Sequence, residues 1–186
     1  MNKQKRETIV LRARSWKFLS VILPPTLGVF GVTALLKGLE AGGAKDFWFV
    51  AATLLTLGAL IHRILSARIL LDPNTLTVIN PFFTYSCARE CVRWPAVRDD
   101  GGLEIHLRDG RIVASFAFGG SPISRVVGTG PKVVGEISSW LNTPRGEPGD
   151  EMHVLRKEWT RAISSELAFA LAALFAAVGL ILRVVA

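Results

Sequence analysis

The sequence is poor in charge and in cysteine. Only 20% of its 186 residues are charged, whereas 50% belong to the apolar set, and its mean hydropathy is +0.38. This composition excludes a soluble globular enzyme, a fibrous repeat and a disordered chain, because each of those classes carries more polar or more biased sequence. Cys87 and Cys91 are the two cysteines, which is too few for a disulfide-stapled secreted domain.

Three long apolar runs stand in place of the missing charge, over residues 18–36, 47–66 and 166–185. Each is long enough to cross a bilayer, which takes roughly 17–25 residues. We therefore expect a transmembrane helical hairpin over 18–66 and a third transmembrane helix over 166–185. The alternative for the first run is a signal peptide, since Ala41–Ala44 resembles a cleavage site, but a signal core spans only about 7–15 residues.

The apolar runs have little chemistry of their own. No Asp, Glu, His or Lys lies in the middle of any run, although ion and proton pathways need such groups at depth, so we expect the runs to act as anchors. Ala168, Ala172 and Ala176 recur at a spacing that lets helices approach closely, which predicts packing on another span or on another copy. Arg63 lies near the end of the second run and Glu166 at the start of the third, at the same leaflet of the bilayer, and we expect them to form an ion pair.

Positive charge is concentrated before the first run. Residues 1–17 hold six cations, which are Lys3, Lys5, Arg6, Arg12, Arg14 and Lys17. Because Lys and Arg are retained on the cytoplasmic side, we expect a multi-pass protein of the cell (plasma) membrane with residues 1–17 and the middle domain cytoplasmic and the C-terminus outside. The six cations, with Arg63, Arg68, Arg89 and Arg93, are also candidate contacts to anionic phospholipid. The alternative is that they only set the orientation.

The middle domain, residues 68–142, has the pattern of strands followed by a helix. Asp72–Thr75 predicts a tight turn, and Leu103–Phe118 predicts a hairpin that turns at Asp109-Gly110. Pro131–Leu141 predicts a helix that begins at its proline. The expected fold class is a three-helix membrane protein with a cytoplasmic α+β roll or open barrel of antiparallel strands and a C-terminal helix.

Residues 143–165 are expected to be a linker and an amphipathic helix. Residues 143–150 include two prolines and two glycines, which is typical of a linker. Met152, Leu155 and Trp159 follow at helical spacing. Such a helix packs on its own domain, lies in the headgroup layer, or binds a partner. Trp94, Met152, Leu155 and Trp159 are therefore candidate partner contacts, and the alternative for Trp94 is an aromatic in the core or at the end of the barrel.

Catalytic, metal and cofactor sites are not expected. Cys87 and Cys91 are four residues apart rather than at the spacing of common zinc ligand pairs, and the three histidines are scattered. Pro131 interrupts the glycine-rich segment Gly128–Lys132, which therefore does not match a phosphate-binding loop. We expect a non-enzymatic protein with ordinary thiols and no cofactor.

Four segments carry a family resemblance: Val78–Thr84, Cys91–Val97, Gly102–Arg111 and Ala114–Ser121. Together they resemble the small bacterial PH-like domains of actinobacterial membrane proteins, the group related to the low-molecular-weight antigen PH domain. The resemblance implies a PH-like roll closed by a helix, tethered to two or three membrane helices, with no enzymatic role. This chain departs in having room for five or six strands before the helix rather than seven. The phosphoinositide binding of eukaryotic PH domains is not carried over, because the turn Asp72–Thr75 contains no cation.

Two functions stay open at this point. The first is a membrane-tethered interaction module whose PH-like domain binds a neighbouring membrane protein, a second copy or anionic phospholipid. The alternative is an accessory subunit of a transport or cell-envelope assembly complex that associates through its transmembrane helices. The net charge of +7 is explained by the orientation signal, so nucleic acid is not an expected partner.

Overall fold

The computed structural model describes residues 8–42, 44–119, 129–143 and 154–185. The chain divides into two compact units. The helical unit is Lys17–Leu65 with Arg161–Ala186, and the mixed unit is Met1–Trp16 with Ser66–Thr160. Each unit is described by itself below.

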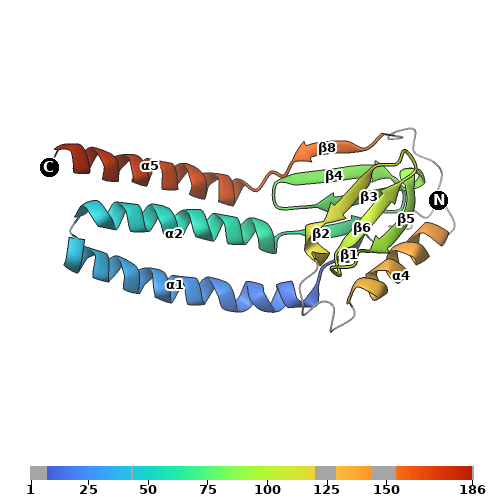
Figure 1. Cartoon of the computed structure of the whole chain (residues 1–186), viewed down its shortest axis with the longest axis horizontal. Helices are drawn as coiled ribbons and strands as arrows, with labels where there is room; N and C mark the ends of the chain where they lie inside the picture. Colours follow the sequence, from blue (N-terminus) through green and yellow to red (C-terminus); the bar gives the residue numbers. More distant parts are fainter. Residues whose placement is uncertain (1–7, 43, 120–128, 144–153, 186) are drawn as a thin grey trace, which may run out of the picture. The chain divides into compact units, whose positions relative to one another are not determined.

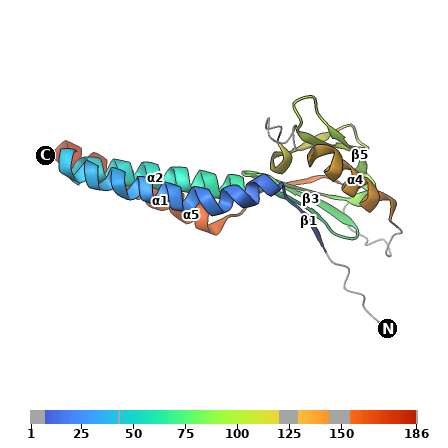
Figure 2. The same ribbon diagram turned by 90° about the horizontal axis from the view of Figure 1, so that it is seen from below.

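The helical unit consists of three helices side by side, α1 (Arg14–Gly42), α2 (Ala44–Leu65) and α5 (Ile163–Val185), with α2 in the middle (Figures 1 and 2). Each contains a stretch long and apolar enough to cross a membrane, Phe18–Gly38, Asp46–Leu65 and Ile163–Val185. The predicted apolar helices are therefore confirmed, with boundaries that differ by a few residues. Most side chains of α1 and α5 are exposed in the isolated chain, as lipid-facing residues would be.

Small residues bring α5 onto α2. A methyl group added at Gly179 would lie 3.1 Å from the ring of Phe49, and the rings of Trp48 and Phe175 meet edge to face at 4.9 Å. Ala172 is buried seven residues before Gly179, on the same helix face. The predicted packing of this alanine face on another span is confirmed at Ala172.

The mixed unit contains two antiparallel sheets (Figure 1). The first has the order β1 (Ile9–Leu11), β2 (Arg68–Leu71), β3 (Thr75–Ile79), β4 (Phe83–Ala88) and β8 (Arg156–Trp159). The second has the order β5 (Val92–Val97), β6 (Leu103–Leu107) and β7 (Ile112–Ser115). Two short 3₁₀ turns, η1 (Arg89–Cys91) and η2 (Phe116–Phe118), follow β4 and β7.

The predicted turns and the predicted helix are present. Asp72 donates its backbone N–H to the carbonyl of Thr75 at 2.9 Å, and Gly110 turns the β6–β7 hairpin with a φ of +85°, which a glycine adopts without strain. Helix α4 (Thr129–Asn142) buries Val133, Ile137 and Trp140 in the same core as the inward residues of both sheets. Antiparallel sheets followed by a helix therefore confirm the coarse α+β prediction.

The domain extends beyond residues 68–142. Strand β1 comes from the segment expected to be only a basic N-terminus, and it pairs with β2 in the register Ile9↔Leu71. Its sequence gives no strand signal because three residues are too few to show alternation. Along the sequence, the helical hairpin α1–α2 thus lies between β1 and β2, two strands that pair with each other.

The amphipathic helix predicted before the third span is wrong where the structure describes it. Residues Arg156–Trp159 form strand β8, which pairs with β4 in the register Phe83↔Trp159. All four β8 residues are exposed, so no apolar alternation marks the strand, and the free edge of β4 decides the conformation instead. Charged residues on this outer strand also protect the sheet edge from pairing with other chains.

Candidate functional site

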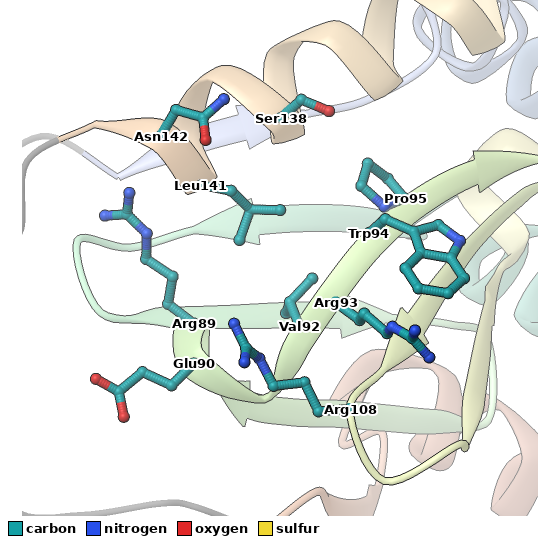
Figure 3. Close-up of a pocket in the computed structure, with 10 residues that line it drawn as sticks. All are labelled: Arg89, Glu90, Val92, Arg93, Trp94, Pro95, Arg108, Ser138, Leu141 and Asn142. Carbon is teal, nitrogen blue, oxygen red and sulfur yellow. The ribbon is translucent and has the colours of Figure 1, made fainter.

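A cleft of about 310 Å³ lies between the start of β5, the η1 turn, the end of β6 and the last turns of α4 (Figure 3). Three arginines line it, Arg89, Arg93 and Arg108, and among the described lining residues Glu90 is the one acid. Trp94 adds an aromatic wall. In Figure 3, Leu141 points from α4 toward the strands, and Ser138 and Asn142 lie on the same helix. The cleft is therefore positively charged, with one aromatic side.

Arg89 is a fixed part of this wall. Its guanidinium is buried, donates to the carbonyl oxygen of Thr143 at 2.6 Å through Nη2, and lies 5.0 Å from the centre of the Trp140 ring. Trp140 in turn donates its indole N–H to the carbonyl of Asp72 at 2.8 Å. Arg89 thus joins the η1 turn to the end of α4 and brings a permanent positive charge to one end of the cleft.

A bulge in β5 turns Arg93 and Trp94 outward together. The pairing of β5 with β6 shifts register between Val92 and Trp94, so two consecutive residues are exposed between buried Val92 and buried Pro95. The guanidinium of Arg93 lies 4.2 Å from the centre of the Trp94 ring. Bulges often aim side chains in this way near functional sites.

Trp94 is a surface residue, so a place in the core is wrong for it, whereas the other form of that alternative, an aromatic at the end of the barrel, stays a prediction. Its side chain is 42% exposed, and its ring stacks on that of His106 with centroids 5.2 Å apart. Contacts to Arg93 and His106 limit its rotation, which makes it a rigid aromatic surface at the rim of the cleft. Its candidate role as a partner contact stays a prediction.

Arg108 enters the cleft from the β6–β7 hairpin (Figure 3). Its backbone N–H donates to the carbonyl of Cys91 at 2.8 Å, which fixes the hairpin beside η1. The neighbouring Asp109 is engaged by Arg111, whose hydrogen bonds hold the pKa of the Asp109 carboxyl below its usual range. The Asp109 carboxylate therefore pairs with Arg111, and neither residue lines the cleft.

The two cysteines are free thiols, of which Cys87 is buried and Cys91 is half-buried. Burial raises the pKa of Cys87 from 9.0 to about 12 and also raises the pKa of Cys91. A nucleophile or a zinc ligand needs the thiolate, which this burial disfavours. Among the residues that the structure describes, no group of three His, Cys, Asp or Glu side chains is placed to hold a metal ion.

The predicted lipid contacts separate into different environments, and the prediction is wrong for Arg63. Its side chain is 2% exposed, and its Nη2 lies 3.4 Å from Oε1 of Glu166. The ion pair expected between these two residues is thereby confirmed, with His62 Nδ1 and Ser165 Oγ 3.0 Å apart beside it. Arg63 cannot serve a lipid headgroup while it is enclosed between α2 and α5.

The other predicted lipid contacts lie near the chain's N-terminus or after α2. Arg68 is exposed at the start of β2, and Arg12 is half-buried before α1. Arg14 and Lys17 belong to α1. Lys3, Lys5 and Arg6 fall outside the residues that the structure describes.

The predicted partner contacts after residue 150 also differ in outcome. Leu155, just before β8, is half-buried and packs against the core of the mixed unit, and its role as a partner contact stays a prediction. Trp159 is exposed at the end of β8. Met152 lies outside the described residues.

Sequence reasoning marked Arg89 and Arg93 as candidate lipid contacts but missed Arg108 and the cleft that the three arginines form, because these residues are separated along the chain by strands and a turn. A comparison of the chain with protein-family models, with curated proteins and with solved structures finds no match. The cleft is therefore interpreted from its own chemistry.

Proposed function

We propose that this protein is a non-enzymatic interaction module, held at the cytoplasmic face of the plasma membrane by three transmembrane helices. Its cleft binds an anionic group of a neighbouring membrane protein or of a phospholipid. The observation that carries the proposal is the convergence of three arginines and an exposed tryptophan against one glutamate around a single cleft.

The chemistry of these side chains suits such a ligand. A guanidinium presents its donors in a planar fork that matches carboxylate and phosphate oxygens. Tryptophan and arginine are also the residues that most often dominate binding energy at protein interfaces. Arg89 is held in place by Thr143 and Trp140, so part of the cleft is organised before any ligand arrives, which lowers the entropy cost of binding.

The arrangement of strands supports a PH-like roll as the frame of the module. Strands β1–β4 lie in one sheet and β5–β7 in the other, and α4 follows them. Strand β8 and the helical hairpin between β1 and β2 are additions to such a roll. The cations of residues 1–17 support a cytoplasmic N-terminus and mixed unit, with the C-terminus outside.

The test is photo-crosslinking in living cells with a benzoylphenylalanine in place of Trp94 in the full chain. We expect one recurrent adduct, identified by mass spectrometry as a protein or a phospholipid. The double variant Arg93→Ala/Arg108→Ala should lower its yield at least about tenfold, because two charge-assisted hydrogen bonds are lost.

A matched control removes the same charge outside the cleft. Arg98 and Arg111 are exposed on the same sheet, where Arg98 pairs with Asp100 and Arg111 with Asp109. The variant Arg98→Ala/Arg111→Ala should keep the adduct. Equal losses in the two double variants, or no loss in either, would refute a specific role of the cleft.

A further inference from the structure

Three large aromatic side chains are exposed together at one edge of the five-stranded sheet. Phe82 lies in the β3–β4 turn, Phe83 begins β4 and Trp159 ends β8, with exposed fractions of 43%, 38% and 53%. The rings of Phe82 and Phe83 lie 6.0 and 5.5 Å from that of Trp159, centre to centre. We call these three residues the aromatic edge.

Hydrogen bonds fix the aromatic edge in its outward position. The side chain of Asn80 accepts from the backbone N–H of Phe116 at 2.7 Å and donates to the carbonyl of Ala114 at 2.9 Å, which holds the β3–β4 turn to the end of β7. Thr160 donates its backbone N–H to Phe82 and its hydroxyl to Asn80, both at 2.9 Å. The rings are thus presented by a rigid turn rather than by a loose loop.

The chain enters and leaves its apolar helices at the same end of the sheet as these rings. The pairings Leu11↔Ile69, Arg68↔Ile79 and Phe83↔Trp159 place the end of β1, the start of β2 and the end of β8 at the end of the sheet where the β3–β4 turn lies. Ile163, the first residue of the third candidate span, is four positions after Trp159. At about 3.5 Å per residue, the backbone of Trp159 lies within roughly 14 Å of that span's first residue.

Cations accompany the aromatic edge. Lys157 places its ammonium group 4.0 Å from the centre of the Phe83 ring, and Arg68 is exposed at the start of β2. Trp with nearby cations is typical of the headgroup layer of a bilayer, because its ring meets acyl chains and its N–H meets water. Phe accompanies Trp on the apolar face of segments that lie in this layer.

We propose that the aromatic edge docks into the headgroup layer of the same bilayer that holds the helices, and so sets the orientation of the mixed unit at the membrane surface. The single occupant is phospholipid. Continuity with the spans argues for it, because the chain tethers these rings within reach of the bilayer whatever else the protein binds.

The test uses the full chain reconstituted in vesicles of equal parts phosphatidylcholine and phosphatidylglycerol. Benzoylphenylalanine replaces Phe82 or Trp159, both exposed aromatic positions that accept a large ring. Irradiation should give phospholipid adducts at both positions. The matched control is the same substitution at Ile112, an apolar residue that is 54% exposed on the three-stranded sheet.

We expect the lipid adduct at Phe82 and Trp159 to exceed that at Ile112 by at least fivefold. Equal yields at all three positions would overturn the proposal, and so would adducts to a second copy of the chain in place of phospholipid. Crosslinking from Trp94 reports on the cleft separately, so failure at the aromatic edge leaves the proposed function to its own test.

Discussion

Arg89 shows how a single buried charge shapes the cleft. The side chain reaches from the η1 turn to the carbonyl oxygens of Pro73 and Thr143 and covers the Trp140 ring. Carbonyl dipoles and an aromatic face replace the water that burial removes, and a planar guanidinium suits both. A lysine at this position has one compact ammonium group, which cannot reach the carbonyl oxygens of both Pro73 and Thr143 as the wider guanidinium does.

We therefore expect Arg89→Ala and Arg89→Lys both to lower the free energy of unfolding of the mixed unit, by about 1–3 kcal/mol, because carbonyls near the core lose their donor. Arg108→Ala, which changes an exposed cleft arginine, should stay within about 0.5 kcal/mol of the unchanged chain. Thermal unfolding in detergent measures all three. If Arg89→Lys were as stable as the unchanged chain, a positive charge alone, without the planar guanidinium, would be enough to hold the η1 turn to the end of α4.

Cys87 gives stability a dependence on alkaline pH. Its pKa is raised from 9.0 to about 12 in the folded chain by burial. Between these values the unfolded chain releases a proton that the folded chain keeps, so stability is complete below pH 9 and falls as the pH rises toward 12. The slope contributed by this thiol approaches about 1.4 kcal/mol per pH unit.

The measurement is unfolding as a function of pH for the unchanged chain and for Cys87→Ala. The variant should lose this part of the alkaline slope, because no buried thiol remains to be ionised. Cys91→Ala, which leaves Cys87 in place, should keep most of it. Parallel pH profiles for the unchanged chain and Cys87→Ala would contradict the assignment.

Some residues could be predicted from the sequence and others could not. The pairing of Arg63 with Glu166 followed from their positions at one leaflet, because span length fixes depth. The exposure of Trp94 depends on a bulge between Val92 and Trp94, and no pattern in the local sequence predicts that bulge. The cleft arginines meet only through tertiary pairing, which no local pattern encodes.

The helices and the long hairpin could be predicted at the scale of elements, because their periodicity extends over many residues. The two outer strands β1 and β8 could not. They have three and four residues, and their conformation depends on the open edges of β2 and β4. Charged β8 is compatible with a helix by composition, so the neighbouring strand decides it.

The Arg63–Glu166 pair gives a test of how α2 and α5 hold together. Arg63→Glu should lower stability by about 1–3 kcal/mol, between the values for exposed and buried pairs, because the Arg63 side chain is enclosed and Glu166 is half exposed. The double exchange Arg63→Glu/Glu166→Arg should recover part of the loss. Thermal unfolding in detergent compares the single and double variants, and an equal loss in both would argue against the pair.

At the scale of the whole molecule, the mixed unit and the helical unit are interleaved along the chain. Strand β1 precedes α1, β2 follows α2, and β8 precedes α5. Both outer strands of the five-stranded sheet, β1 and β8, are therefore followed along the chain by an apolar helix. The three connections leave the sheet at one end, where Leu11, Arg68 and Trp159 lie, whereas a domain on a single flexible linker is tethered at one point.

Replacing the apolar helices distinguishes the two functions. Residues 18–65 and 163–185 would be exchanged for an unrelated three-helix membrane unit with the same connections. All cleft residues belong to the mixed unit, so crosslinking from Trp94 should persist at an unchanged yield. Protection of Cys87 from a thiol reagent would verify that the mixed unit has folded. Loss of the adduct despite that protection would favour an accessory subunit that associates through its helices, because only the membrane-spanning surface would then have changed.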